Sequence, residues 1–208
     1  MPDFRIAVFA SGQGGNFQAL VDAAEQGGLG ASVELLVCDK AQAPVVQRAR
    51  KAGIDVHLFD PKQYSAREEY EAEIVGILQR KDIDLVVLAG YMRLLTSTMV
   101  DAYQGRLINI HPSLLPAFPG KNAIGQALDY GVKVTGVTIH YVDGGMDTGP
   151  IIAQHAVEIQ SGDTQESLAV SIHEIEQQLY PQVVSWFAQG RVKLEGRSVT
   201  VLEPENKV

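Results

Sequence analysis

The segment Arg5-Ile-Ala-Val-Phe-Ala-Ser-Gly-Gln-Gly-Gly-Asn-Phe17 runs from an apolar stretch through a glycine-rich turn into a helical pattern. The residues from Ile6 to Phe9 are apolar without interruption, so a strand at this place would be buried on both faces. Strands of this kind are typical of a parallel sheet that is covered by helices on both sides. The segment therefore predicts the first strand–turn–helix unit of an α/β fold.

The alternation of strand and helix patterns continues over most of the chain. We expect strands at residues 5–10, 33–38, 56–58, 84–88, 107–111, 134–142 and 151–157, and helices at residues 17–26, 44–52, 66–79, 96–103, 123–130 and 164–188. Because strand–helix–strand units are right-handed, this order predicts a doubly wound, mostly parallel sheet. No linker or repeat divides the chain, so we expect residues 1–208 to form a single domain.

The last third of the chain departs from the simple alternation. The strands at 134–142 and 151–157 are joined by a short loop rich in glycine and aspartate, which predicts an antiparallel extension of the sheet. The long C-terminal helix that follows is expected to begin at Asp163 as N-cap, with Glu166 at its third position. Pro181 is expected to kink this helix or to end it early. Residues 192–194 and 199–202 are expected to form a small hairpin around Gly196.

The composition narrows the function classes. The 208 residues are 46% hydrophobic and 20% charged, with a formal net charge of -8, which disfavours binding to nucleic acid. The single cysteine, Cys38, excludes an intramolecular disulfide and fits a reducing compartment. A signal-peptide pattern and a long apolar stretch of membrane-spanning type are both missing from the sequence. We therefore expect a cytoplasmic protein without a membrane partner.

The glycine-rich turn Ser11-Gly-Gln-Gly-Gly-Asn16 is the first candidate for a binding site. In an open α/β sheet such a turn lies at the carboxyl ends of the strands, where backbone amides at the start of a helix bind anions. Phe17 stands where a dinucleotide-binding turn has its third glycine, and Asp39 is the nearest acidic residue to the end of the second strand. The turn is thus either a monophosphate site or a simple connection, and taken alone it does not discriminate between them.

The segment Leu107-Ile-Asn-Ile-His-Pro112 carries the candidate chemistry. Side chains alternate along a strand, so Asn109 and His111 point to the same face, and Pro112 ends the strand beside them. An amide donor next to a protonated imidazole suits the oxyanion that develops in acyl transfer. A lone histidine at a strand end is more often satisfied by its neighbours. The pairing with Asn109 favours a functional site.

The loop Asp143-Gly-Gly-Met-Asp-Thr-Gly-Pro150 supplies two carboxylates. Asp147 is a candidate for holding His111 protonated, or for positioning a water molecule that carries a proton. Without the other motifs, this loop would be interpreted as an acidic surface turn.

Taken together, these motifs resemble the phosphoribosylglycinamide formyltransferase family, and the similarity runs from the first strand to about Gly190. The motifs that carry the resemblance are Ser11–Asn16, Leu88-Ala-Gly-Tyr-Met-Arg-Leu-Leu95, Asn109-Ile-His-Pro-Ser-Leu-Leu-Pro116 and Asp143–Pro150. Asn109, His111 and Asp147 also occur in other folate-dependent formyltransferases, so they indicate the reaction rather than the acceptor. The turn that ends in Asn16 and the whole length point to glycinamide ribonucleotide as acceptor.

The resemblance implies a Rossmann-like formyltransferase fold and a specific reaction. The formyl group of the co-substrate 10-formyltetrahydrofolate would pass to the amine of 5-phosphoribosylglycinamide, a step of de novo purine biosynthesis. Its partners would be these two small molecules, and a homodimer is left open. The resemblance also assigns residues. Asn109, His111 and Asp147 are catalytic, His140 supports them, the nucleotide is bound by Gly14, Gly15, Asn16, His173, Glu174 and Glu176, and the folate is bound by Arg67, Met92, Arg93, Leu94, Leu95, Asn109, Asp143, Gly144, Gly145, Met146 and Asp147.

The loop after Pro116 departs from some family members, which carry a basic residue and a histidine where this chain has Ala117 and Asn122. This leaves open which groups in 117–123 close over the substrate, with Lys121 as a possible substitute, and whether Leu115-Pro116 is cis.

Three other functions would share some of these motifs. A methionyl-tRNA formyltransferase should carry a basic C-terminal domain, and a formyltetrahydrofolate hydrolase usually has an extra N-terminal domain, whereas here the first strand begins at Arg5. A non-catalytic nucleotide-binding module is the alternative from a different class.

Several residues are expected to be structural. His57 and His155 lack polar neighbours in their strands, and the acidic residues between Glu68 and Glu73 are most simply a solvated helix face. The segment that begins at His173 lacks the second histidine of a zinc-protease helix, so no metal is expected there.

Overall fold

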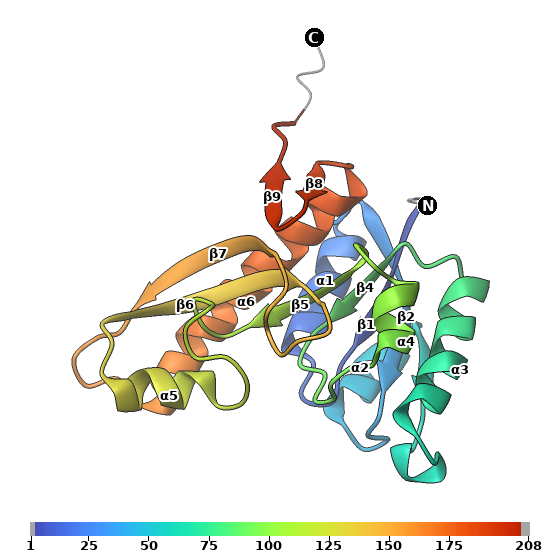
Figure 1. The fold of residues 1–208 in the computed structure, drawn as a ribbon, viewed down its shortest axis with the longest axis horizontal. Helices are drawn as coiled ribbons and strands as arrows, with labels where there is room; N and C mark the ends of the chain where they lie inside the picture. Colours follow the sequence, from blue (N-terminus) through green and yellow to red (C-terminus); the bar gives the residue numbers. More distant parts are fainter. Residues whose placement is uncertain (1–2, 205–208) are drawn as a thin grey trace.

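The computed structural model describes residues 3–204, and its centre is a sheet of seven strands in the order β3-β2-β1-β4-β5-β6-β7 (Figure 1). The strands are β1 (Phe4–Phe9), β2 (Ala31–Cys38), β3 (Asp55–Leu58), β4 (Leu85–Leu88), β5 (Leu107–His111), β6 (Val134–Tyr141) and β7 (Ile151–Glu158). The first five strands are parallel, and β6 and β7 continue the sheet in antiparallel pairing. The predicted doubly wound sheet with an antiparallel extension is therefore confirmed.

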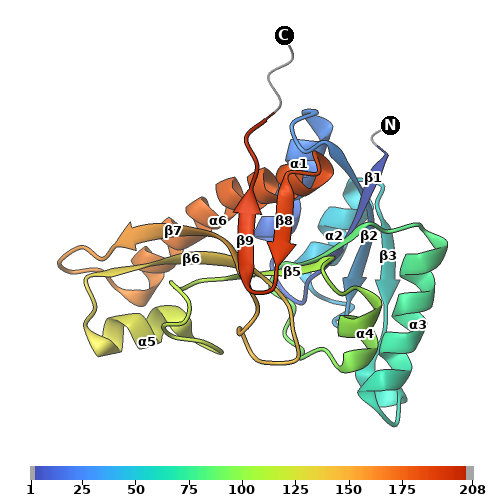
Figure 2. The same ribbon diagram turned by 45° about the horizontal axis from the view of Figure 1, so that its top comes forward.

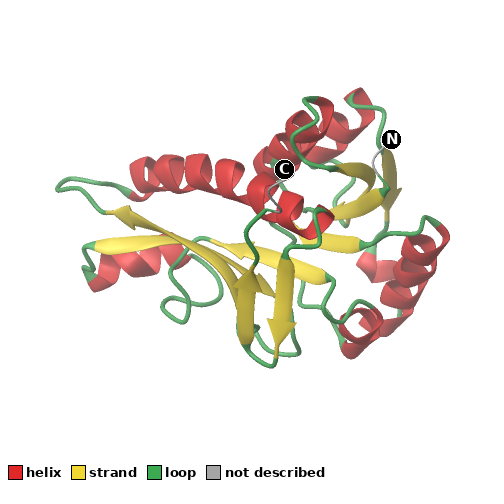
Figure 3. Cartoon of the chain, turned by 90° about the horizontal axis from the view of Figure 1, so that it is seen from above, coloured by secondary structure: helices red, strands yellow, loops and turns green. Residues whose placement is uncertain are grey.

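Helices cover both faces of the sheet, as Figure 3 shows from above. They are α1 (Gly15–Glu25), α2 (Pro44–Lys51), α3 (Arg67–Arg80), α4 (Ser97–Ala102), α5 (Ala123–Tyr130) and α6 (Gln165–Ala188), with a short 3-10 turn at Pro61–Gln63. Alternate residues of β1 face opposite sides: Ile6 and Val8 pack with α1, α2 and α6, while Ala7 and Phe9 pack with α3 and α4. The uninterrupted apolar run of this strand is thus buried on both faces.

The strand order places the expected ligand site. The chain leaves β1 for a helix on one face and leaves β4 for a helix on the other, and these two strands are neighbours. Open α/β sheets bind their ligands near such a point of reversal, at the carboxyl edge of the sheet. The glycine-rich turn after β1 and the segment after β4 lie together at this edge, and β5 lies beside β4.

A separate hairpin, β8 (Val192–Glu195) and β9 (Ser198–Val201), follows α6 as predicted. Figure 2 shows it standing next to the β6–β7 part of the sheet. Its turn is anchored there, because Arg197 Nη2 donates a hydrogen bond of 2.9 Å to the carbonyl oxygen of Thr148. The C-terminal hairpin thus contacts the loop that carries Asp147.

Two local expectations were wrong, and one of the two alternatives for Pro181 is excluded. The N-cap of α6 is Thr164 and not Asp163: Thr164 and Ser167 form a reciprocal capping box, while the Asp163 carboxylate accepts hydrogen bonds from the backbone N–H of Gln160 and the Ser167 hydroxyl. Pro181 does not end the helix, because the burial of Val183 and Val184 in the next turn stabilises its continuation.

The other wrong expectation concerns Glu71, which is fully buried rather than part of a solvated helix face. It lies on the side of α3 that faces α4, where Thr96 donates to it from both its backbone N–H and its hydroxyl. A buried carboxylate requires donors of this kind, and periodicity along α3 does not reveal them.

Candidate active site

The catalytic candidates on β5 meet a histidine of β6. Asn109 lies opposite His140 in the antiparallel ladder, and His111 lies opposite Thr138. The same register places Ile108 and Ile110 on the other face, in the core under α6. His111 and His140 are 5% and 2% exposed, so their ring nitrogens must find partners within the protein.

Asp147 reaches this group from the loop between β6 and β7. Its Oδ2 accepts a 2.7 Å hydrogen bond from the Gly120 N–H and lies 3.5 Å from His111 Nδ1, while Oδ1 lies 3.7 Å from His140 Nε2. The residue adopts a φ of 54°, in the left-handed region that is costly for a side chain other than glycine. The loop therefore holds the carboxylate between both rings.

The Asp147 carboxyl group is strongly acidic here. The His140 ring, the Gly120 N–H and the charge of His111 together lower its pKa to about 2, against the opposing effect of partial burial. At neutral pH Asp147 is therefore a carboxylate, which accepts hydrogen bonds and stabilises positive charge on its neighbours.

His111 lies between two acceptors. Its Nε2 donates to the carbonyl oxygen of Phe118 at 2.9 Å, and its Nδ1 faces the Asp147 carboxylate. Both ring nitrogens of His111 thus face oxygen acceptors.

His140 orients Asn109. Its Nδ1 donates to the carbonyl oxygen of Tyr141 at 2.8 Å. Its Nε2 lies 3.3 Å from the amide nitrogen of Asn109 and 3.7 Å from Asp147 Oδ1. The ring therefore positions the Asn109 amide beside the Asp147 carboxylate.

The loop that departs from the family closes this group through its backbone. Phe118 and Gly120 supply the carbonyl and the N–H that bind His111 and Asp147, while the Lys121 side chain is exposed. Leu115-Pro116 is cis. The contacts of this loop with His111 and Asp147 are thus made by its backbone and not by the side chains at 117 and 122.

The glycine-rich turn forms the start of α1. Gly14 has a φ of 77°, and a Cβ at this position would lie 2.6 Å from Val45 Cγ2, so both conformation and space require glycine. No side chain caps the helix here, which leaves its first N–H groups available to an anion. The turn has the form of a phosphate site.

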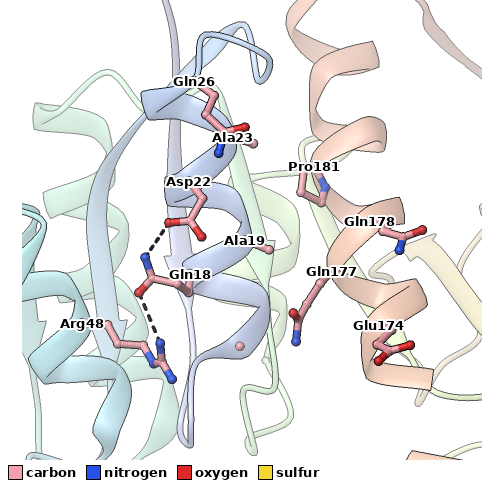
Figure 4. A pocket seen from close by; sticks show the side chains of 11 residues that line it. Gln18, Ala19, Asp22, Ala23, Gln26, Arg48, Glu174, Gln177, Gln178 and Pro181 are labelled. Atoms are coloured by element: carbon pink, nitrogen blue, oxygen red, sulfur yellow. Dashed lines mark hydrogen bonds between the residues drawn. The ribbon is translucent and has the colours of Figure 1, made fainter. Parts of the chain in front are cut away.

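Of the nucleotide-binding candidates on α6, only Glu176 forms a hydrogen bond with this turn. Asn16 Nδ2 donates to Glu176 Oε2 at 3.0 Å, and burial raises the pKa of Glu176. His173 and Glu174 are exposed on the same helix. Glu174 lines a groove of about 580 Å³ between α1 and α6, which Figure 4 shows, together with Gly15, Arg48 and Gln177.

The folate candidates after β4 form an anchored loop with apolar side chains facing outward. Met92 and Leu94 are 68% and 53% exposed, and Arg67 Nη1 donates to the Leu94 carbonyl at 3.4 Å. Arg93 forms an ion pair of 2.7 Å with Asp39. Sequence reasoning missed Asp39 and the buried Glu71 as supports of this loop, because their partners lie far away along the chain.

The second folate segment, Asp143–Asp147, is a tight turn. Asp143 Oδ1 accepts hydrogen bonds from the Gly145 N–H and the Thr148 hydroxyl, and Met146 is half exposed. The turn closes against Gly149, where a Cβ would lie within 1.7 Å of the Tyr141 carbonyl oxygen. This packing fixes the direction from which Asp147 enters the site.

Two findings concern other ligand classes. Within residues 3–204, no group of three or more His, Cys, Asp or Glu side chains has the arrangement of a metal site. Over the same residues, no helix combines the length and apolar character needed to cross a membrane.

The two histidines expected to be structural differ: His155 is exposed, whereas His57 does have a polar neighbour, Glu73, at 3.9 Å.

The amide, imidazole and carboxylate groups beside the point of reversal of the sheet suit the stabilisation of an oxyanion during group transfer. The formyl transferase family model matches residues 4–184, and the chain belongs to this family.

Similar proteins within this family are named for one particular reaction. The phosphoribosylglycinamide formyltransferase of Bacillus subtilis (strain 168) is 52% identical over 180 residues, which cover 86% of this chain and 92% of that protein. The protein of the same name from Escherichia coli (strain K12) is 40% identical over 91% of this chain and 89% of its own length. A crystal structure of glycinamide ribonucleotide transformylase 1 from Symbiobacterium toebii superimposes with a TM-score of 0.94 at 46% identity, covering 96% of this chain and 94% of that one.

Proposed function

We propose that the chain transfers the formyl group of 10-formyltetrahydrofolate to the amine of 5-phosphoribosylglycinamide, a step of de novo purine biosynthesis. The products are formylglycinamide ribonucleotide and tetrahydrofolate. The observation that carries the proposal is the meeting of Asn109 and His111 of β5 with Asp147 of the loop between β6 and β7, beside the carboxyl edge of β1 and β4. The names of the similar proteins support the choice of both substrates.

The two substrates approach this group from opposite sides in the proposal. The nucleotide phosphate binds the start of α1, and its ribose and glycinamide extend along α6, with the residues Gly14, Gly15, Asn16, His173, Glu174 and Glu176. The folate binds the loops after β4 and β6, where exposed apolar side chains fit its rings, with the residues Arg67, Met92, Arg93, Leu94, Leu95, Asn109, Asp143, Gly144, Gly145, Met146 and Asp147. Both substrates then meet at β5, and holding them there makes the attack effectively intramolecular.

The reaction follows from the groups present. The amine nitrogen attacks the formyl carbon, and the electron pair of the carbonyl moves to oxygen. The amide N–H of Asn109 and the charge of His111 stabilise this oxyanion. Its collapse breaks the bond between the formyl carbon and N10, and the proton of the attacking amine ends on N10. Because the pKa of Asp147 is about 2, Asp147 does not store this proton; it orients the water or the imidazolium that carries it.

The contact between His111 and Phe118 adds a requirement to this mechanism. In the structure the Nε2–H of His111 is already donated to the Phe118 carbonyl oxygen. For this N–H to reach the oxyanion, the loop around Phe118 must give up the contact when substrate binds. Until then the carbonyl holds the ring in place.

The assay that tests the function measures loss of 10-formyltetrahydrofolate by the purified chain, with and without 5-phosphoribosylglycinamide. Loss that requires the nucleotide and yields formylated product supports the proposal. Loss without it, with release of formate, would identify a hydrolase instead. No loss in either condition would favour a nucleotide-binding module.

Replacement of His111 tests the site. We expect His111→Ala to lower kcat by about 100- to 1,000-fold, because one oxyanion-stabilising group is lost. His155→Ala is the matched control, since His155 is exposed on β7 away from the group. Near-normal kcat in His111→Ala would contradict the role given to this residue.

Three wider statements belong to the proposal. We take residues 1–208 as one formyltransferase domain, with the N-terminal part binding the nucleotide phosphate and the C-terminal part binding the folate. A cytoplasmic location is supported by the single cysteine, Cys38. A homodimer remains a prediction, which light scattering of the purified chain tests directly.

A further inference from the structure

Asp39 links the two substrate loops. This residue follows β2, where many dinucleotide-binding α/β proteins carry an acidic residue that binds a ribose hydroxyl. Here the carboxylate is only 2% exposed and both its oxygens are engaged within the protein. Ser11 donates its hydroxyl to Oδ1 at 2.6 Å, and Arg93 donates Nε to Oδ2 at 2.7 Å. Asp39 is therefore unavailable to a ribose.

Ser11 connects the glycine-rich turn to the loop after β4. It is the first residue of the glycine-rich turn, it is buried, and its hydroxyl oxygen accepts a 3.2 Å hydrogen bond from the backbone N–H of Met92. Its own backbone N–H donates to the carbonyl oxygen of Gly90. The nucleotide turn thus holds the start of the folate loop directly, and through Asp39 it holds the Arg93 side chain.

The other end of the folate loop is held independently. Thr96 donates its backbone N–H and its hydroxyl to the fully buried Glu71 of α3. Loop 91–96 is therefore fixed at both ends by buried carboxylates, and only the end at Met92 and Arg93 is joined to the nucleotide turn. Hydrogen bonds to a charged group are stronger than neutral ones, so this end is held firmly.

We propose that Ser11 and Asp39 are positioning residues that fix the folate loop to the nucleotide turn. This inference rests on the proposed function, because it assigns the loop after β4 to the folate. Neither residue contacts the reacting atoms in this scheme. Their effect is on the place at which the backbone of loop 91–96 meets the folate, so a residue of the nucleotide turn sets the affinity for the other substrate.

The kinetic test uses Ser11→Ala and Asp39→Asn with both substrates varied. We expect the KM for 10-formyltetrahydrofolate to rise by about tenfold in each variant, since Ser11→Ala removes the hydroxyl that joins Asp39 and Met92, and Asp39→Asn removes the charge that holds Arg93. The kcat at saturating folate and the KM for the nucleotide should change much less. Equal changes in both KM values, or a loss confined to kcat, would overturn the inference.

A matched control and a second readout make the result independent of activity. Asp55→Asn removes another carboxylate that is paired with a cation, Lys81, but it lies at β3, at the edge of the sheet. We expect backbone amide hydrogen exchange at 92–94 to accelerate in Ser11→Ala and Asp39→Asn, and to stay unchanged in Asp55→Asn. Unchanged exchange in the first two variants would refute the network. An inactive wild-type chain with accelerated exchange in those variants would refute the proposed function alone.

Discussion

The ionisation of Asp147 is set by its neighbours, and this leads to a prediction at the scale of the single residue. The His140 ring, the Gly120 N–H and the His111 charge lower its pKa from the usual 3.8 to about 2. A group whose pKa is lower in the folded protein adds stability above its unfolded pKa and loses it as the pH falls through the folded value. The shift of nearly two pH units corresponds to about 2 kcal/mol.

The measurement is the free energy of unfolding of the wild type and of Asp147→Asn between pH 6 and pH 2. We expect the variant to be less stable by about 2 kcal/mol above pH 4, and the difference to shrink as the pH falls from about 4 to 2. A difference that stays constant over this range would show that the Asp147 charge does not contribute to stability.

Residue-scale inference from the sequence worked where neighbours along one strand determine the geometry. Asn109 and His111 were predicted to share a face because side chains alternate along a strand, and the structure confirms this. The partners of these side chains lie on other segments: His140 is on β6, and the Phe118 carbonyl is in a loop. Strand periodicity contains no information about such partners.

At the scale of elements, the C-terminal hairpin is expected to support the Asp147 loop. Arg197, in the turn between β8 and β9, donates to the Thr148 carbonyl oxygen next to Asp147. Loss of this hydrogen bond, worth about 1 kcal/mol, should misplace the loop and lower kcat/KM for the folate by about fivefold in Arg197→Ala.

The check is steady-state kinetics with both substrates, with Lys193→Ala as control. Lys193 is exposed on β8 of the same hairpin and carries the same charge. A similar loss in both variants would indicate a general charge effect rather than support of the loop by Arg197.

Element positions were predicted well and element details less so. The apolar periods located the strands and helices to within a few residues, because they reflect which face is buried. The start of α6 was misplaced by one residue, since Asp163, Thr164 and Ser167 all have side chains that can cap a helix. The burial of Glu71 was missed because a helix face reads as polar whether water or another helix covers it.

For the whole molecule, nucleotide binding should raise thermal stability. A ligand that binds only the folded chain adds about 2.7 kcal/mol at 100 times its Kd. For a chain of this length that corresponds to an increase in Tm of about 5–10 °C. Thermal unfolding with 5-phosphoribosylglycinamide measures this shift.

Glycinamide without the ribose phosphate is the control, because it lacks the group that the start of α1 is proposed to bind. We expect it to leave Tm unchanged at the same concentration. An equal shift with both compounds would place the main binding energy outside the glycine-rich turn.

The sequence by itself determined the doubly wound sheet, the glycine-rich turn at the start of α1 and the common face of Asn109 and His111. Each of these follows from patterns within one strand, one helix or one turn. The tertiary structure alone decided that Asp39 joins Ser11 and Arg93, which lie 28 and 54 residues away along the chain. It also decided that backbone groups of Phe118 and Gly120 bind the catalytic side chains. The physical reason is that a buried polar group must find a partner wherever the folded chain brings one, and the path of the chain determines which one that is.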